Sequence, residues 1–198
     1  MSRAPGRASA PPPEIRIAGP DWVAGAVDWD HRSVAVEERM LLAIALAGRN
    51  VERGTGGPFG AAVFERDSGR LVSVGVNSVV RLNNSVLHAE IVALMMAQRR
   101  LGSYSLAAPG LPAHELVTSC DPCAMCLGAA LWSGVTRLVC GAAREDAAVL
   151  HFDEGPVFPE SYDYLRDRGV EVVRLVCRDE ARAVLDVYRR GSGPIYNP

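Results

Sequence analysis

Two short segments hold the side chains best suited to chemistry: HAE at 88–90 and PCAMC at 122–126. Each begins a stretch with helical apolar spacing. Cys123 and Cys126 are then one turn apart on the same face of a helix. Two thiolates and the imidazole of His88 make three metal ligands, and a catalytic zinc ion keeps its fourth tetrahedral position for water. The pattern therefore predicts an open zinc site, with one Zn²⁺ per chain.

The residues around the two cysteines also predict how their thiols ionise. Pro122 suits the first position of a helix, because its missing N–H would be unpaired there in any case. The positive end of the helix dipole lowers the pKa of a thiol. Both Cys123 and Cys126 can therefore be thiolates at neutral pH.

Cys120 offers a rival interpretation of the same segment. It lies before Cys123 at a spacing that makes CxxCxxC, and a fourth thiolate would close the metal site. A closed site is typical of structural zinc, and the protein would then be a non-catalytic interaction module. Cys120 falls at the end of a predicted strand, so we expect its side chain to point elsewhere. The two interpretations differ in whether Cys120 approaches the metal.

Glu90 lies two residues after His88, and on a regular helix these two side chains point in different directions. Glu90 is therefore not expected to bind the metal in the same way. A free carboxylate beside a zinc-bound water suits proton transfer. The alternative is an exposed glutamate favoured by the dipole of the first helical turn. The neighbouring ligand set favours the proton-transfer role.

Composition limits the class of protein. The chain has 198 residues, 48% of them apolar, which is enough for one domain with a full core. A formal charge of −2 and the absence of a long basic run disfavour nucleic acid and favour a small-molecule substrate. Five cysteines without a recognisable secretory signal indicate a cytoplasmic protein with reduced thiols. No apolar run is long enough to span a membrane.

Helices and strands alternate along the chain. Apolar spacing predicts helices at 34–53, 88–101, 122–133, 159–168 and 178–190, and strands at 60–66, 71–77, 114–119, 135–142 and 170–176. A turn at 67–69 makes the first two strands a hairpin. The fold class is therefore α/β, a three-layer α/β/α sandwich with a mixed, five-stranded and mostly parallel central sheet.

HAE followed by PCxxC resembles the signature of the cytidine-deaminase-like zinc deaminases, and the similarity covers about residues 34–190. Within that superfamily, the chain most resembles bacterial guanine deaminases. The stretches that carry this resemblance are GGPFGAAV (56–63), Asn77, HAEIVAL (88–94), TSCDPCAMCLGA (118–129) with Trp132 after it, and FDEGP (152–156). The resemblance implies a helix–sheet–helix sandwich with zinc between the starts of two helices.

The resemblance also implies residues that contact the substrate. It implies that Asn77 hydrogen-bonds the purine and that Phe59 and Trp132 help to form the base pocket. Ala89, between the ligand histidine and Glu90, is expected to contact the substrate as well. Apart from the resemblance, Phe59 and Trp132 could equally be core aromatics, and Asn77 could cap a turn.

In the proteins that the chain resembles, a second acidic residue takes part in proton transfer together with the glutamate that corresponds to Glu90. Glu154 is the matching position, Asp153 is the alternative, and an exposed loop carboxylate is the simpler interpretation of either. The C-terminal tail closes the pocket in these proteins and can come from the partner subunit. The resemblance therefore implies that Tyr196 is a lid residue and that the protein is a homodimer with exchanged tails.

The reaction implied is the hydrolytic deamination of a purine base, with guanine converted to xanthine and ammonia. Free cytosine, nucleosides such as guanosine, aminotriazines and tRNA adenosine remain alternative substrates. The chain is expected to divide into a disordered tail (1–13), an extension that packs on the domain (14–33), the zinc deaminase domain (34–190) and a C-terminal tail (191–198).

Overall fold

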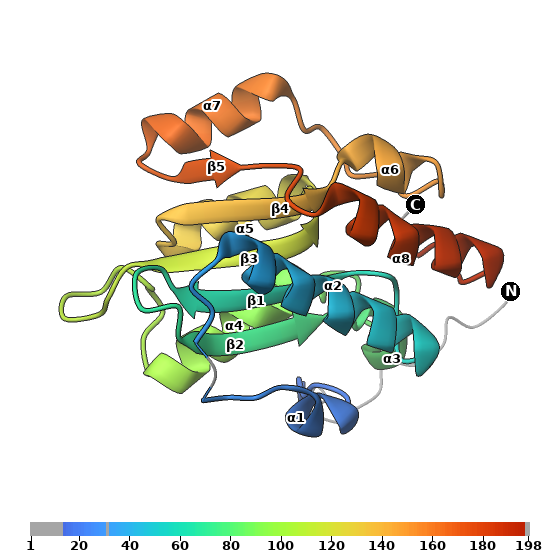
Figure 1. Cartoon of the computed structure of the whole chain (residues 1–198), viewed down its shortest axis with the longest axis horizontal. Helices are drawn as coiled ribbons and strands as arrows, with labels where there is room; N and C mark the ends of the chain where they lie inside the picture. Colours follow the sequence, from blue (N-terminus) through green and yellow to red (C-terminus); the bar gives the residue numbers. More distant parts are fainter. Residues whose placement is uncertain (1–13, 31, 197–198) are drawn as a thin grey trace, which may run out of the picture.

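Five strands form a single sheet in the order β2-β1-β3-β4-β5 in the computed structural model, which describes residues 14–30 and 32–196 (Figure 1). The strands are β1 (Gly60–Glu65), β2 (Leu71–Val76), β3 (His114–Cys120), β4 (Arg137–Ala142) and β5 (Glu171–Val173). β1 is antiparallel to both of its neighbours, whereas β3, β4 and β5 are mutually parallel. The predicted mixed five-stranded sheet is confirmed. The disordered tail predicted at 1–13 and positions 197–198 of the C-terminal tail lie outside the described residues.

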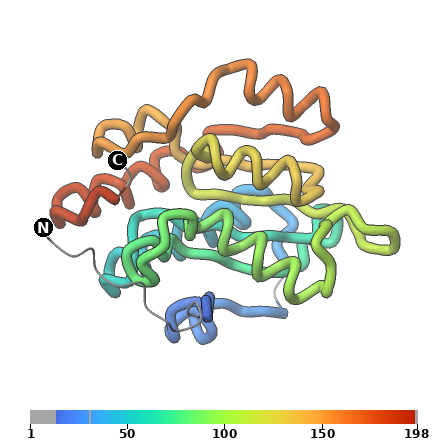
Figure 2. Tube along the Cα trace, turned by 180° about the vertical axis from the view of Figure 1, so that it is seen from behind, coloured from blue at the N-terminus to red at the C-terminus, as the bar shows by residue number. Residues whose placement is uncertain are grey.

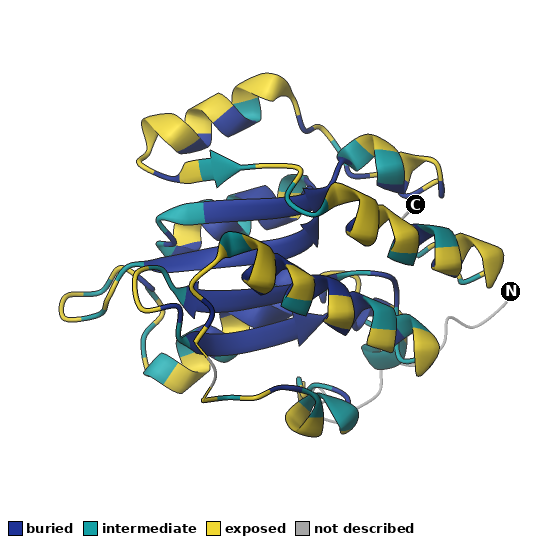
Figure 3. Ribbon diagram, viewed as in Figure 1, coloured by how far each residue is buried: buried dark blue, intermediate teal, exposed yellow. Residues whose placement is uncertain are grey.

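Helices cover both faces of this sheet. The described helices are α1 (Trp22–Ala26), α2 (Val36–Glu52), α3 (Val79–Leu82), α4 (Ala89–Leu101), α5 (Ala124–Ser133), α6 (Arg144–Ala148), α7 (Pro159–Asp167) and α8 (Arg178–Arg190). α2 and α8 cross the face seen in Figure 1, and the reverse view in Figure 2 shows α4 and α5 on the other. The central strands are buried while the outward faces of the helices are exposed (Figure 3). This arrangement confirms the three-layer sandwich.

Two glycines let helices pack unusually close to the sheet, one on each face. A Cβ on Gly75 of β2 would lie 2.2 Å from the carbonyl oxygen of Ala89 in α4. On the opposite face, a Cβ on Gly60 of β1 would lie 2.3 Å from the carbonyl oxygen of Ala43 in α2. Any side chain at either position would push the helix away from the sheet.

Two predicted elements differ from the structure. The helix expected from Pro122 begins at Ala124, with Cys123 as its N-cap in an extended conformation, so Pro122 precedes the helix instead of starting it. The strand expected at 170–176 pairs only over 171–173, because the chain then turns through Leu175, which has a φ of 66°. The short helices α1, α3 and α6 were not predicted, since each spans too few residues to show a period.

The segment before α2 lies against the body of the protein. Trp22, Val23, Ala26 and Trp29 are partly buried against the core beneath α2. An isolated bridge joins Arg32 to Arg70. Across the described part of the chain, no helix has both the length and the hydropathy that a bilayer crossing requires.

Candidate metal centre

The three predicted ligands meet where two helices begin. His88 is the N-cap of α4, Cys123 is the N-cap of α5, and Cys126 lies in the first turn of α5. One ligand atom from each lies within 4.8 Å of the other two, and Cys123 Sγ is 3.5 Å from His88 Nδ1. Ligands on one tetrahedral zinc ion are separated by roughly 3.5 Å, given bonds of about 2.0–2.3 Å. The donor set and its spacing therefore fit Zn²⁺.

The two thiols do not ionise alike before a metal ion binds, although the same helix begins at both. A hydrogen bond from Cys126 lowers the pKa of Cys123 to about 4, with a further contribution from His88. Sharing its proton with Cys123, together with burial, raises the pKa of Cys126 well above its usual value. Two adjacent thiolates repel each other, so the pair keeps one proton until a cation offsets the second charge. Metal binding at Cys126 therefore releases a proton.

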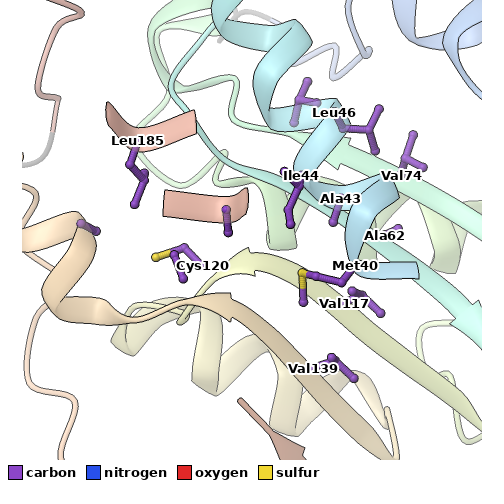
Figure 4. Packing of buried hydrophobic residues seen from close by; sticks show 14 of the residues in the cluster. Met40, Ala43, Ile44, Leu46, Ala62, Val74, Val117, Cys120, Val139 and Leu185 are labelled. Atoms are coloured by element: carbon purple, nitrogen blue, oxygen red, sulfur yellow. The ribbon is translucent and has the colours of Figure 1, made fainter. Parts of the chain in front are cut away.

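Cys120 lies outside this ligand cluster. Its side chain is 3% exposed and its thiol donates to the carbonyl oxygen of Ala143 over 3.7 Å. Figure 4 shows it in the core beneath α2 and α8, near Leu185. Cys120 packs in the buried cluster that contains Met40 of α2 and Leu185 of α8, whereas α5 packs in the cluster on the other face of the sheet. The described residues thus bring together three protein ligands.

A small cavity of about 20 Å³ adjoins the metal ligands. Its lining residues are Phe59, Asn77, His88, Glu90, Asp121, Phe152, Glu154 and Tyr196. Such a volume accommodates roughly one water molecule and is too small for a base. Of the residues singled out from the sequence, six line this cavity.

Two carboxyl groups of the cavity are buried, so the simpler interpretation of each as an exposed residue is wrong. Glu90 is 6% exposed, and burial followed by the charge of Cys123 raises its pKa. Glu154 is 8% exposed, and burial, Cys123 and Glu90 together raise its pKa to about 8. The N–H of Ala124 donates to the carbonyl oxygen of Glu154 over 3.0 Å, which ties the FDEGP loop to the start of α5. The pKa values of both carboxyl groups are therefore raised, and that of Glu154 lies near neutral pH.

Asn77 follows β2 and is fully buried. Its Oδ1 accepts a hydrogen bond from the N–H of Val79 over 3.3 Å, so the side chain does cap the turn into α3. Its Nδ2 is buried, makes no hydrogen bond of normal geometry within the described part of the chain, and lies beside the hydroxyl group of Tyr196. A buried donor without a partner is costly. Asn77 therefore offers the cavity a donor that a bound molecule could use.

Aromatic rings form the wall beside Asn77. The rings of Phe59 and Phe152 meet edge to face with their centroids 5.1 Å apart. The ring of Tyr196 lies 5.1 Å from that of Phe152, and its hydroxyl group is buried. The C-terminal segment of the same chain thus closes one side of the cavity.

Three residues from the sequence interpretation are not brought to the cavity by this chain. Trp132, near the end of α5, is 83% exposed, so it is neither a pocket wall nor a core aromatic here. Asp153 is exposed, and its Oδ1 accepts the N–H of Gly155 over 2.8 Å. The side chain of Ala89 is buried in the core between α4 and the sheet.

Sequence reasoning missed two lining residues. Phe152 stands within FDEGP, and its spacing of two from Glu154 could have indicated that both face one cavity. Asp121 is 3% exposed, and its carboxylate binds the guanidinium of Arg174, with Nε of Arg174 3.0 Å from Oδ1. Only the fold shows this pairing, because the two residues come from separate elements.

Comparison with known proteins places these observations in a family. Residues 34–142 match the family described as the cytidine and deoxycytidylate deaminase zinc-binding region. Guanine deaminase of Bacillus subtilis is 37% identical over 118 residues, which cover 60% of this chain and 71% of that protein. A solved structure of guanine deaminase from Nitrosomonas europaea superposes with a TM-score of 0.86 at 44% identity, covering 89% of this chain and 97% of that one. A further structure, with a TM-score of 0.86 and 44% identity over 89% of this chain and 98% of that chain, is a variant in complex with 8-azaguanine.

Proposed function

The chain belongs to the cytidine and deoxycytidylate deaminase zinc-binding family, and from this premise we propose that it deaminates a purine base hydrolytically, converting guanine and water to xanthine and ammonia. One observation carries the proposal. Two buried carboxyl groups and an unpartnered amide donor surround a single cavity beside a His/Cys/Cys cluster. This combination provides a metal site, proton carriers and a contact for a heterocyclic base in one place.

His88, Cys123 and Cys126 would hold the zinc ion. A bound Zn²⁺ lowers the pKa of water and so supplies a nucleophile at neutral pH. Glu90 lines the same cavity as His88, and its carboxylate would accept a proton from the attacking water as that water adds to the ring carbon that bears the amino group. Glu90 then passes the proton to the adjacent ring nitrogen. Its burial suits this exchange, because a raised pKa makes the carboxylate a stronger proton acceptor than an exposed one.

Glu154 would donate a proton to the amino group, which leaves as ammonia while the hydroxyl group on the same ring carbon gives its proton to Glu90 and becomes the carbonyl group. Transfer of that proton from Glu90 to Glu154 would then restore both carboxyl groups. The carboxyl group of Glu154 is protonated near neutral pH, since burial raises its pKa to about 8. Asp153 is exposed and bound to its own loop, so we assign the second proton transfer to Glu154. A glutamine at 154 should abolish this transfer, whereas Asp153→Asn should leave turnover within about twofold.

Asn77 and the aromatic wall would orient the base. The Nδ2 of Asn77 donates to an acceptor on the ring, and Phe59 and Phe152 present apolar surface to its edge or face. The cavity is smaller than a purine, so Tyr196 must move for a base to enter. We propose Tyr196 as the residue that closes the pocket after binding.

We also propose a cytoplasmic homodimer built from the deaminase domain at 34–190. The five cysteines are free, which suits a reducing compartment. Trp132 and Met125 on α5 expose apolar surface that a second copy of the chain would cover. Light scattering after size exclusion should give twice the chain mass, and a monomer would contradict the proposal.

An ammonia-release assay tests the function. Zinc-loaded protein is incubated with guanine, guanosine, adenine, cytosine, cytidine and aminotriazines, and guanine should be the best substrate. Glu90→Gln should retain zinc and lower kcat by about 10²- to 10⁴-fold, because proton transfer contributes that much. Full turnover by zinc-loaded Glu90→Gln protein would refute the role of Glu90. Release from another compound but not from guanine would refute the substrate.

A further inference from the structure

Asn50 lies near the end of α2, and both polar atoms of its buried side chain have hydrogen-bond partners outside the metal ligands. It is 0% exposed. Its Nδ2 donates to the carbonyl oxygens of Gly57 and Asn77, both at 2.9 Å. Its Oδ1 accepts the hydroxyl group of Thr55 over 2.7 Å. A single side chain thus joins the loop after α2 to the residue that follows β2.

The groups that Asn50 holds belong to the cavity wall. The N–H of Asn77 donates to the carbonyl oxygen of Phe59 over 3.0 Å, and the N–H of Phe59 donates to that of Gly57 over 2.9 Å. A Cβ on Gly56 would lie 2.0 Å from the carbonyl oxygen of Asn77 and 2.6 Å from Nδ2 of Asn50. The loop therefore packs directly against the side-chain amide of Asn50. The N–H and the carbonyl oxygen of Asn77 both have hydrogen-bond partners, which hold its backbone in place.

The segment before α2 reaches the same network. Nε1 of Trp22 donates to Oγ1 of Thr55 over 3.1 Å, so this hydroxyl group accepts from Trp22 and donates to Asn50. On the other side of Asn77, Arg81 donates to the carbonyl oxygen of Ala18 over 2.5 Å. The segment before α2 thereby contacts Thr55 in the loop before Asn77 in sequence and Arg81 after it.

We infer that Asn50 is a positioning residue for the substrate, and that Trp22 acts through Thr55 to fix the rotamer of Asn50. Asn50 holds the backbone of Asn77, while Val79 holds its Oδ1, so the free Nδ2 has one direction. Loss of the first contact lets Asn77 rotate, and its donor then no longer faces the ring. The inference rests on the proposed function in one respect, the contact between Asn77 and the base.

Thr55→Val is the main test because it removes the hydroxyl group at nearly constant volume and leaves α2 intact, whereas Asn50→Ala would leave buried carbonyl groups unpaired. The KM for guanine should rise about tenfold, the equivalent of one well-placed hydrogen bond, with kcat changed by less than about threefold. Zinc content should not change. Thr136→Val is the matched control: its hydroxyl group donates to a backbone carbonyl over 3.1 Å, Thr136 is half-buried as Thr55 is, and it lies at the opposite end of the sheet. It should keep the KM of the unmodified protein.

Combining Thr55→Val with Asn77→Ala separates positioning from general loss of stability. If Thr55 acts through Asn77, adding Thr55→Val to Asn77→Ala should change KM by less than about twofold. Trp22→Phe should raise KM about threefold, and its control Trp29→Phe should not, because Nε1 of Trp29 donates to the carbonyl oxygen of Ala24 in its own segment and not to Thr55.

Equal KM values for Thr55→Val and Thr136→Val, or full additivity with Asn77→Ala, would overturn the inference while leaving the deaminase function standing. If the unmodified protein releases no ammonia from guanine, the proposed function fails by itself. Crystal structures of the zinc-loaded Thr55→Val and Thr136→Val proteins then decide the positioning role. An Asn77 amide displaced in the first alone supports it, and an unchanged amide overturns it.

Discussion

Gly75→Ala should damage the fold and the metal site together, because this glycine sets the distance between α4 and the sheet. The added methyl group would lie 2.2 Å from the carbonyl oxygen of Ala89, and 2.4 Å and 3.0 Å from N and Cα of Ala93. These are backbone atoms of a helix and cannot rotate aside. Relieving the overlap requires α4 to move by roughly 1 Å, since protein interiors are close-packed.

The expected cost lies at the upper end of the range for overpacking, about 3 kcal/mol of unfolding free energy. His88 is the N-cap of α4, so the same movement draws it away from Cys123 and Cys126 on α5. Disturbed placement of a ligand typically weakens metal binding by about 10- to 100-fold. Urea denaturation of the metal-free protein measures the first effect, and competition with a zinc chelator measures the second.

Gly128→Ala is the matched control for this experiment. Gly128 lies within α5, and a Cβ there would meet nothing within 4 Å. The substitution should stabilise the protein by about 0.5–1 kcal/mol, because alanine loses less backbone entropy in a helix. If Gly75→Ala costs less than about 0.5 kcal/mol and zinc affinity is unchanged, the argument from close approach is refuted.

Three further predictions follow from buried charges and thiols. Burial raises the pKa of Glu154 from 4.5 to about 8. In the metal-free protein, its contribution to stability is therefore full below about pH 4.5 and is lost as the pH rises through about 8. Glu154→Gln should remove this loss, which is measured by comparing urea midpoints at about pH 5 and pH 9. Glu115 is fully buried and pairs with the buried Arg39, so Glu115→Ala should cost about 3–5 kcal/mol on denaturation, and a cost below about 1 kcal/mol would contradict this role. Cys120→Ala should keep one zinc per chain while Cys123→Ala should lose it in metal analysis, and loss of zinc from Cys120→Ala would restore the four-ligand interpretation.

The sheet could be predicted strand by strand because its runs are short, apolar and bounded by turn residues. β1 and β2 lie within one residue of the ranges expected from the sequence. β5 was overestimated, because an apolar run does not reveal where its neighbour stops offering hydrogen bonds. Its partner β4 pairs with it only over three residues.

The sequence by itself singled out the proposed metal ligands and the carboxyl group proposed for proton transfer, since a histidine and two cysteines at predicted helix starts indicate a metal site by residue type and spacing. Only the tertiary structure decided which side chains are buried and which are exposed to solvent. It buries Glu90 and Glu154, packs Cys120 in the core between the sheet and α2 and α8, leaves Trp132 exposed, and places the side chain of Asn50 against the backbone of Asn77. Burial and hydrogen bonding depend on which segments pack together, and these segments are distant in the chain, so no local pattern encodes them.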